Sequence, residues 1–407
     1  MDYLSELKSK DALVKKHLDE LRSKKVLLRV DLNGPVKDNK LIFHYKVDVC
    51  SRLVAEYTSN GASLVILTHQ GRPGNVEFVE NLKAYADMIE KRSGVSVDYI
   101  DSLTGKKVKK AVENLKPGDC IFLPNVRSYP EETKLKTIEE KVNSNFVKFF
   151  TPLVDLYIND AIAVSHRDNT SLVAFPQVIK SFCGLQTEFE LKMLYRLKSA
   201  IEEGKEVVFL IGGKKFEKID YLLKILSNPN VKFLIGGIPG QLITMAKGIK
   251  LNLDNERFLD GIDISSAKQI LNFHDRILHP LDFTLETKVS VSLNELPSSK
   301  GLIMDIGPET TERYREMMRN ADVCVIAGPT GVYELGFNSI FEIIKSVADK
   351  RTFILGGHSS DLLYNNNNLF EHFVGNGGKI LTCGGAALAF LAGKKMPGIE
   401  AIINGKS

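Results

Sequence analysis

The sequence has no long apolar run and no closely spaced pair of cysteines. No apolar stretch approaches the roughly 18 residues that a membrane-spanning helix needs. The first residues, MDYLSELKSKDALVKK, carry too much charge for a secretory signal. The cysteines are odd in number and form no CxxC pair of the kind that holds zinc; they are Cys50, Cys120, Cys183, Cys324 and Cys383. We therefore expect a cytoplasmic protein with reduced, mostly buried thiols and no membrane partner.

The two commonest nucleotide-binding signatures are also missing. Neither a Walker A sequence nor a GxGxxG fingerprint occurs in the chain. The net charge of +4 is small for 407 residues. Such a charge fits a modestly basic surface, or a site for acidic ligands, better than a nucleic-acid binder. We expect small-molecule partners and no nucleic acid, assign no side chain as a metal ligand, and find no indication of the oligomeric state.

What the chain does contain indicates a two-lobed α/β protein. At 407 residues it is about twice the length of a typical domain, so two lobes are favoured over one very large domain. Short apolar runs rich in β-branched residues alternate with stretches of helical periodicity, which predicts parallel sheets with helices on both faces. The predicted strands are residues 26–30, 64–67, 120–123, 156–158, 207–211, 233–235, 302–304, 323–326, 353–355 and 380–381.

The residues that follow these strands differ between the two halves of the chain. In the first half they are charged or hydrogen-bonding: Asp31, Asn33, His69, Arg72, Asn125, Arg127, Asn159, Asp160, His166 and Arg167. In the second half they are glycines: Gly212, Gly213, Gly236, Gly237, Gly307, Gly328, Gly331, Gly356, Gly357, Gly384 and Gly385. Because ligands of open parallel sheets bind beyond the carboxyl ends of the strands, both sets are expected to line sites.

The two predicted sites differ in chemistry. Arginines and a histidine converging with Asp and Asn suit a small anion that carries hydroxyl groups. Glycine turns that lead into helices suit a polyphosphate, because bare backbone N–H groups and the positive end of the helix dipole face it. Each motif alone has a simpler explanation: Asp31 and Asn33 could be turn chemistry, and the segment Gly212-Gly213-Lys214-Lys215 could be a charged surface turn. The repetition of the theme at several strand ends favours the anion pocket.

Ten motifs in order resemble the phosphoglycerate kinase family along nearly the whole chain, with the compact look of its archaeal members. They are VDLNGP, THQGRPG, PNVRSYPEE, INDAIAVSHR, IGGKK, DIGPET, AGPTGVYE, GGHSS, TCGGAALAFL and KKMPG. The resemblance implies two Rossmann-like lobes joined by a hinge: residues 1–182 for the acid substrate, residues 183–393 for nucleotide, and a tail, 394–407, that returns to the first lobe. It also implies reversible phosphoryl transfer between 1,3-bisphosphoglycerate with ADP and 3-phosphoglycerate with ATP, with Mg²⁺ as the cofactor of the nucleotide.

The resemblance assigns roles to particular residues. The acid substrate is expected to contact Asp31, Asn33, Lys46, His69, Arg72, Arg127 and Arg167. The nucleotide is expected to contact Gly212, Gly213, Lys215, Gly328, Pro329, Glu334, Gly356, Gly357, His358, Ser359, Ser360, Gly384 and Gly385. Lys46 and Lys215 are the expected catalytic cations.

Some positions depart from the family pattern, and they lie among the residues expected to act in catalysis and nucleotide binding. Lys46 stands where the family has a catalytic arginine, which keeps the charge but loses the guanidinium fork. Ser359 stands where the family has the aspartate that organises the metal-bound nucleotide, and Asp361 comes two positions later. The leading hypothesis is an active phosphoglycerate kinase. Two alternatives stay open: a catalytically weak or inactive binding or regulatory protein of the same fold, and a kinase for another small acid.

Overall fold

The computed structural model describes residues 2–214 and 219–406, and the chain forms two compact units. Unit 1 comprises Met1–Lys192 and Gly393–Ser407, and unit 2 comprises Met193–Ala392. The chain therefore passes from one unit to the other within helix α10 (Leu185–Glu202). Residue 182, where the sequence places the end of the first lobe, lies in strand β8 (Ser181–Cys183). This strand pairs with β7 (Leu156–Asp160) in unit 1.

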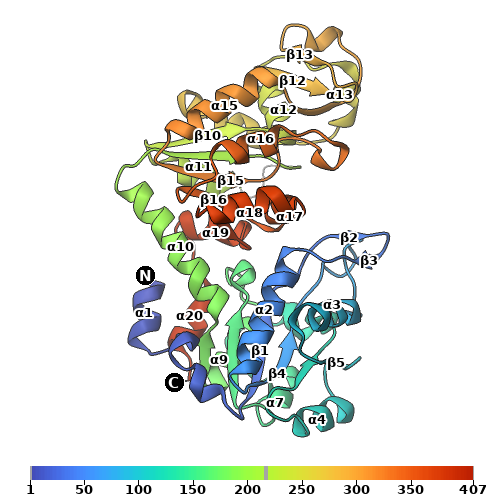
Figure 1. Ribbon diagram of the computed structural model, residues 1–407, viewed down its shortest axis with the longest axis vertical. Coiled ribbons are helices and arrows are strands. Elements are labelled where there is room, and N and C mark those ends of the chain that lie inside the picture. The colour runs from blue at the N-terminus through green and yellow to red at the C-terminus, as the bar shows by residue number, and fades with distance from the viewer. Residues whose placement is uncertain (1, 215–218, 407) are drawn as a thin grey trace. The chain divides into compact units, whose positions relative to one another are not determined.

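Unit 1 is built on a six-stranded parallel sheet with the order β5-β6-β4-β1-β7-β8 (Figure 1). Its remaining strands are β1 (Lys25–Val30), β4 (Ser63–Leu67), β5 (Val97–Tyr99) and β6 (Cys120–Phe122), and a separate hairpin joins β2 (Val36–Lys37) to β3 (Lys40–Leu41). The α-helices are α1 (Tyr3–Ser9), α2 (Tyr45–Ser59), α3 (Lys83–Ser93), α4 (Lys106–Glu113), α5 (Glu131–Lys134), α6 (Ile138–Val142), α7 (Asn145–Phe150), α8 (Thr170–Val173), α9 (Phe175–Val178) and α20 (Pro397–Asn404).

The core of unit 1 explains why its strands are almost continuously apolar. Leu27 and Val65 pack on one face against Phe146, Phe150 and Phe175 from α7 and α9, while α2 contacts β4. Because side chains of a strand alternate between the two faces, a sheet covered on both faces needs apolar residues at every position.

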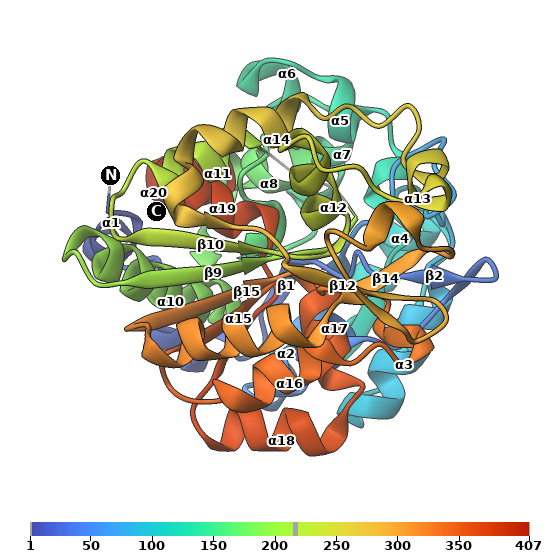
Figure 2. The same cartoon turned by 90° about the horizontal axis from the view of Figure 1, so that it is seen from above.

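Unit 2 has a second six-stranded parallel sheet, with the order β11-β10-β9-β15-β16-β17. Its strands are β9 (Val207–Ile211), β10 (Val231–Ile235), β11 (Ile277–Leu278), β15 (Val323–Ala327), β16 (Thr352–Leu355) and β17 (Lys379–Leu381). The helices are α11 (Ile219–Leu226), α12 (Gly237–Ala246), α13 (Leu253–Phe258), α14 (Ser265–Ile270), α15 (Pro308–Asn320), α16 (Ser339–Ser346), α17 (Gly357–Tyr364), α18 (Asn367–Gly375) and α19 (Gly385–Leu391). Figure 2 shows α15 and α16 on one side of β9, β10 and β15, and α11 and α14 on the other.

One predicted strand does not belong to either parallel sheet. Residues 302–304 form part of β14 (Ile303–Ile306), which pairs antiparallel with β12 (Asp282–Leu285) in a three-stranded sheet completed by β13 (Ser290–Ser292). The apolar run identified a strand but not its neighbours, because pairing direction is set by the connections and not by local composition. The other predicted strands lie in the two parallel sheets, which confirms the predicted fold class.

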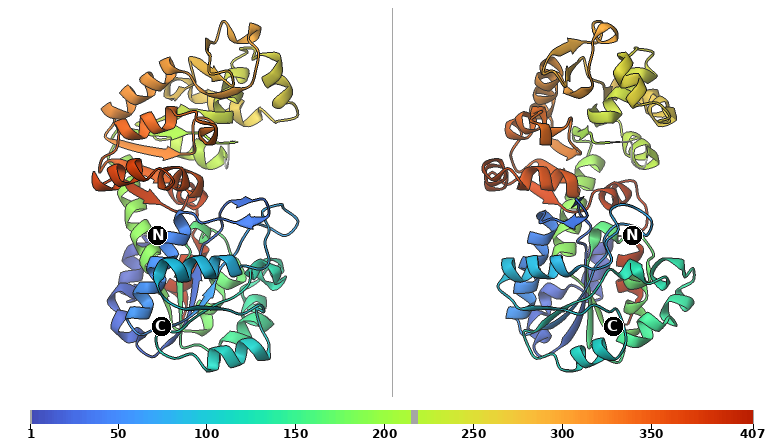
Figure 3. Two further views of the ribbon diagram at one scale, coloured as in Figure 1. Left: turned by 45° about the vertical axis from the view of Figure 1, so that its right-hand side comes forward. Right: turned by 90° about the vertical axis from the view of Figure 1, so that its right-hand side faces the viewer.

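The C-terminal tail completes unit 1. Helix α20 packs against α1, α8 and α9, and both chain termini lie in this unit (Figure 3). The Asn159 amide, at the end of β7, donates a hydrogen bond to the Gly398 carbonyl at 3.1 Å. The tail therefore braces the end of a strand whose following loop carries Arg167. Among the helices of the described residues, none has the length and apolar character to cross a membrane.

Candidate active site

In unit 1, the loop after β1 and the first turn of α2 meet in a buried ion pair. The Lys46 ammonium donates to Asp31 Oδ2 at 2.7 Å and to the Asn33 carbonyl at 3.1 Å. Both side chains are less than a tenth exposed. Burial alone would raise the pKa of Asp31, but Lys46 and His69 outweigh it and hold the pKa below its usual range.

The loop after β4 is fastened to this loop by amide side chains. Asn33 Oδ1 accepts from the Gly71 N–H at 2.7 Å. Gln70 bonds both the N–H and the carbonyl of Gly34. Asn33, expected to contact substrate, thus also ties the two loops together and fixes the position of the turn that carries His69 and Arg72.

His69 is buried, and its neighbours determine the protonation state and tautomer of its ring. A guanidinium nitrogen of Arg29 lies 3.3 Å from Nδ1, and because arginine only donates, Nδ1 is the acceptor of this contact. Burial, opposed by Asp31 and reinforced by Arg127 and Arg29, lowers the pKa of His69 well below its usual value. The ring is therefore neutral, with its proton on Nε2 and available for donation to a ligand.

Three further arginines lie in the same region. Arg127 donates to the Gly71 carbonyl, and burial together with the charges of Arg167 and Arg29 lowers its pKa to about 10. Burial and Arg72 lower the pKa of Arg167. Burial and the positive charges of neighbouring arginines both disfavour the charged form of an arginine, so the pKa values of Arg127 and Arg167 fall. The structure thus gathers Asp31, Asn33, Lys46, His69, Arg127, Arg167 and, at the exposed rim, Arg72.

A buried network of Arg29, Ser171 and Glu132 adjoins this cluster and was not predicted from the sequence. The Arg29 guanidinium, within β1, donates to Ser171 Oγ at 3.0 Å. Glu132 Oε1 accepts from Ser171 Oγ, and Glu132 Oε2 accepts from the Ser171 N–H, both at 2.8 Å. The available signal was an arginine inside an otherwise apolar strand, because a charge is buried there only if it is paired. Its partners, distant in sequence, had no local signal.

In unit 2, the glycine loops after β9, β10 and β15 approach one another through bare backbone. Gly213 N donates to the Pro329 carbonyl at 2.8 Å, and Gly237 N donates to the Thr330 carbonyl at 2.7 Å. A Cβ on Gly212 would lie 2.1 Å from the Pro329 carbonyl oxygen. Gly328 has a φ of +103°, and a Cβ there would meet the Gly212 carbonyl. Glycine at these positions is therefore required by backbone contact as well as suited to a phosphate.

The loops after β16 and β17 form a second glycine contact. Gly356 (φ +90°) would place a Cβ 3.1 Å from the Cα of Gly384. These two residues immediately precede α17 and α19, which begin at Gly357 and Gly385. The N-terminal N–H groups of a helix have no intrahelical acceptor and carry a partial positive charge, so these turns can bind anionic oxygens.

The serines of the GGHSS motif have different partners. Ser359 Oγ accepts from the Gly328 N–H at 2.8 Å and so links the β15 loop to α17. Ser360 Oγ donates to the Gly356 carbonyl at 2.8 Å, inside the first turn of its own helix. Both serines are buried, whereas His358 and Glu334 are exposed. The predicted catalytic residue Lys215 lies outside the described residues, and its neighbour Lys214 is exposed.

Comparisons with known proteins agree with this arrangement. The model of the phosphoglycerate kinase family matches residues 16–394. The phosphoglycerate kinase of Pyrococcus furiosus is 33% identical over 403 residues, covering 94% of this chain and 95% of that protein. That of Methanopyrus kandleri is 34% identical over 401 residues, covering 94% and 96%. The crystal structure of phosphoglycerate kinase from Pyrococcus horikoshii OT3 is 30% identical, covers 94% of this chain and 96% of that one, and has a TM-score of 0.82. With the motifs placed at the strand ends of two parallel sheets, the chain belongs to the phosphoglycerate kinase family of phosphotransferases.

Proposed function

We propose that this protein catalyses reversible phosphoryl transfer between 1,3-bisphosphoglycerate with ADP and 3-phosphoglycerate with ATP. The observation that carries the proposal is the gathering of Asp31, Lys46, His69, Arg127 and Arg167 at one end of the unit 1 sheet. Arginine forks match the geometry of phosphate and carboxylate, and the neutral His69 adds a donor for a hydroxyl or phosphate oxygen. We place the reaction in the cytoplasm, because all five cysteines are free and buried.

The glycine loops of unit 2 are the proposed nucleotide site. The N-termini of α17 and α19 supply donors for phosphate oxygens, and Gly212, Gly213, Gly328, Pro329 and Glu334 supply the walls. Lys215 is the proposed cation at the transferring phosphoryl group, and Lys46 is its counterpart in unit 1. Phosphoryl transfer depends on positioned charges more than on covalent catalysis, and the two lysines and the helix N-termini would supply such charges.

Mg²⁺ is the proposed cofactor and would arrive with the nucleotide. Within the described residues, no group of three His, Cys, Asp or Glu side chains could hold a metal. Mg²⁺ bound with a nucleotide usually keeps most of its ligands from water and phosphate and needs few protein groups. Ser359 and the exposed face of the α17 N-terminus are the protein groups proposed to contact the metal-bound phosphates. The metal would offset the negative charge of those phosphates.

A coupled assay with purified protein, ATP, Mg²⁺ and 3-phosphoglycerate tests the proposal. We expect ADP formation that depends on both substrates and is lost in Arg127→Gln but kept in the surface control Arg22→Gln. Binding of 3-phosphoglycerate without any transfer would replace the proposal by the non-catalytic alternative. Transfer to another small acid, in preference to 3-phosphoglycerate, would keep the kinase and change its substrate.

A further inference from the structure

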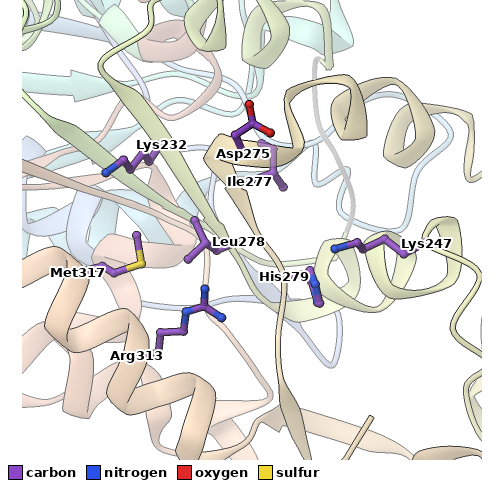
Figure 4. A pocket seen from close by; sticks show the side chains of 8 residues that line it. All are labelled: Lys232, Lys247, Asp275, Ile277, Leu278, His279, Arg313 and Met317. Carbon is purple, nitrogen blue, oxygen red and sulfur yellow. The ribbon is translucent and has the colours of Figure 1, made fainter. Parts of the chain in front are cut away.

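A cavity in unit 2 is lined by none of the residues of the glycine loops. It has a volume of about 390 Å³ and is lined by Lys232, Lys247, Asp275, Ile277, Leu278, His279, Arg313 and Met317 (Figure 4). These residues come from β10, β11, the residues just before and just after β11, the C-cap of α12 and the middle of α15. The cavity therefore opens at the edge of the sheet where the two-residue strand β11 is the last strand. Its volume falls within the range of about 300–1,000 Å³ that is usual for small-molecule sites.

The lining carries an excess of positive charge that the protein does not neutralise. Three of the eight lining residues are Lys or Arg and one is Asp. Lys232 is paired with Glu206 at 2.8 Å. Over residues 2–214 and 219–406, no carboxylate lies within ion-pair distance of Lys247 or Arg313. Both side chains are exposed at the mouth of the cavity, and an anion bound in the cavity would pair with them.

His279 adds a hydrogen-bond acceptor between these cations. Its Nδ1 donates to the Pro280 carbonyl at 2.8 Å, which leaves Nε2 as the acceptor of the neutral ring. Burial, opposed by the hydrogen bond to Pro280 and reinforced by the charges of Lys247 and Arg313, lowers the pKa of His279 below its usual value, so the ring is neutral at pH 7. Figure 4 shows Lys247 and Arg313 on different sides of His279. A ligand here would meet two cationic donors and one acceptor.

The rest of the lining is apolar. Ile277, Leu278 and Met317 form it, and Ile277 is buried. A bare inorganic ion would leave this surface uncovered, whereas a short carbon chain would cover it. We propose that this cavity is a binding site for a small organic anion, a phosphate ester or carboxylate, that also carries a hydroxyl group. The anionic group pairs with Lys247 and Arg313, the hydroxyl donates to His279 Nε2, and the carbon chain packs on Leu278 and Met317.

The site can be tested by NMR of the full chain with histidine labelled at ¹³Cε1. Glycerol 3-phosphate is the probe, and His279→Gln identifies the resonance of His279. We expect that resonance to shift saturably as the probe is added. Lys247→Gln/Arg313→Gln should weaken the apparent affinity by at least about ten-fold, because two charge-assisted hydrogen bonds are lost. The matched control Lys250→Gln/Arg319→Gln changes exposed cations nearby and should leave the affinity unchanged.

Three probes separate the parts of the proposal. Propyl phosphate has the anionic group and the carbon chain but no hydroxyl, so it should bind more weakly than glycerol 3-phosphate, and inorganic phosphate should bind more weakly still. A His279 resonance that does not move while that of His69 does would overturn the site. Equal shifts in the Lys247→Gln/Arg313→Gln protein, or with sodium chloride at the same ionic strength, would also overturn it. Equal affinity for the three probes would contradict the recognition of hydroxyl and carbon chain.

Discussion

Lys46 is held at two points by the loop that follows β1, and this constrains what the side chain can do. Its ammonium is bonded to Asp31 Oδ2 and to the Asn33 carbonyl. A lysine is a single point charge on a flexible stem, whereas arginine presents a planar fork. One cation at this position can therefore neutralise Asp31 or reach a transferring phosphoryl group, but it cannot bind two oxygens of that group while it keeps Asp31.

Lys46→Arg is expected to raise turnover at saturating Mg²⁺ without changing nucleotide affinity. The fork could keep one hydrogen bond to Asp31 and direct another to the phosphoryl group. Steady-state kinetics with varied nucleotide separate the two effects, because an interaction made only in the transition state appears in kcat and not in binding. A changed KM for nucleotide with unchanged kcat would contradict the assignment of Lys46 to the transferring group.

Lys46→Met is expected to lower the free energy of unfolding by about 3–5 kcal/mol at pH 7, because it leaves the buried Asp31 carboxylate unpaired. The lowered pKa of Asp31 means that its contribution to stability is present above its unfolded pKa and is lost as pH falls. The difference between wild type and variant should therefore shrink at pH 3. Urea unfolding at both pH values measures it, with Lys46→Arg as the charged control.

Ser359 and Ser360 are adjacent buried serines with different hydrogen-bond partners, so their alanine variants can be compared directly. Ser359→Ala removes the acceptor of the Gly328 N–H, which is expected to cost about 1–3 kcal/mol and to weaken nucleotide binding. Ser360→Ala removes the bonds from Ser360 Oγ to the carbonyls of Gly356 and Leu381 and leaves the Gly328 N–H paired, so it should weaken nucleotide binding less than Ser359→Ala does. Ser359→Asp keeps an acceptor and adds a carboxylate, and it should lower the Mg²⁺ concentration for half-maximal activity. If Asp361 already supplies the carboxylate, Ser359→Asp will have no effect and Asp361→Ala will abolish the metal response.

At the level of elements, the sequence predicted all strands of the two parallel sheets except β5, β8 and β11. Strands such as β1 and β9 are buried on both faces and are marked by composition alone. Strands β8 and β11 have three and two residues, and their pairing depends on neighbours distant in the sequence. The residues at the ends of the long strands were predicted for the same reason, since a buried strand fixes where its polar end lies. The network that joins Arg29 to Glu132, and the bond from Gly328 to Ser359, could not be predicted from the sequence, because their residues come together only in the folded chain.

Asp160 links the end of β7 to the start of α10. Its carboxylate accepts from the Thr187 N–H at 2.8 Å and from the Tyr57 hydroxyl at 2.7 Å, and burial raises its pKa to about 6. The folded pKa exceeds the unfolded value, so the native state holds more protons between about pH 4 and pH 6. Stability contributed by the protonated form is therefore present at pH 4 and lost as pH rises through 6.

Asp160→Asn should remove this pH dependence, because the amide keeps an acceptor and cannot ionise. At pH 7 the variant is expected to be more stable than wild type by on the order of 3 kcal/mol, since the pKa is raised from 3.8 to about 6 and one pKa unit corresponds to about 1.4 kcal/mol. At pH 4 the two proteins should be equal. His44 and His69 titrate in the opposite sense in wild type and variant alike, so the difference between the two urea curves isolates Asp160. A variant that is less stable than wild type at pH 7 but not at pH 4 would mean that the charge is favourable and would contradict the raised pKa.

For the chain as a whole, the residues proposed to bind the two substrates belong to different units. The arginines and His69 belong to unit 1, and the glycine loops belong to unit 2. Each unit has its own parallel sheet and its own core. The sequence alone predicted this separation of the two sites, because arginine-rich strand ends fall in one half of the sequence and glycine-rich ones in the other. The attachment of the C-terminal tail to unit 1 was predicted only from the family resemblance, because the short segment 394–407 carries little periodicity.

Binding of one substrate should therefore not require the other. In calorimetry without nucleotide, the full chain is expected to bind 3-phosphoglycerate, with an affinity that falls as salt rises because the contacts are ionic. Arg167→Gln should weaken this binding by about ten-fold or more, the loss of one charge-assisted contact, and leave ADP affinity unchanged. Ser359→Ala should do the reverse, and Arg22→Gln should change neither. Binding of 3-phosphoglycerate that appears only with nucleotide present would contradict this separation and place a binding determinant of the acid in unit 2.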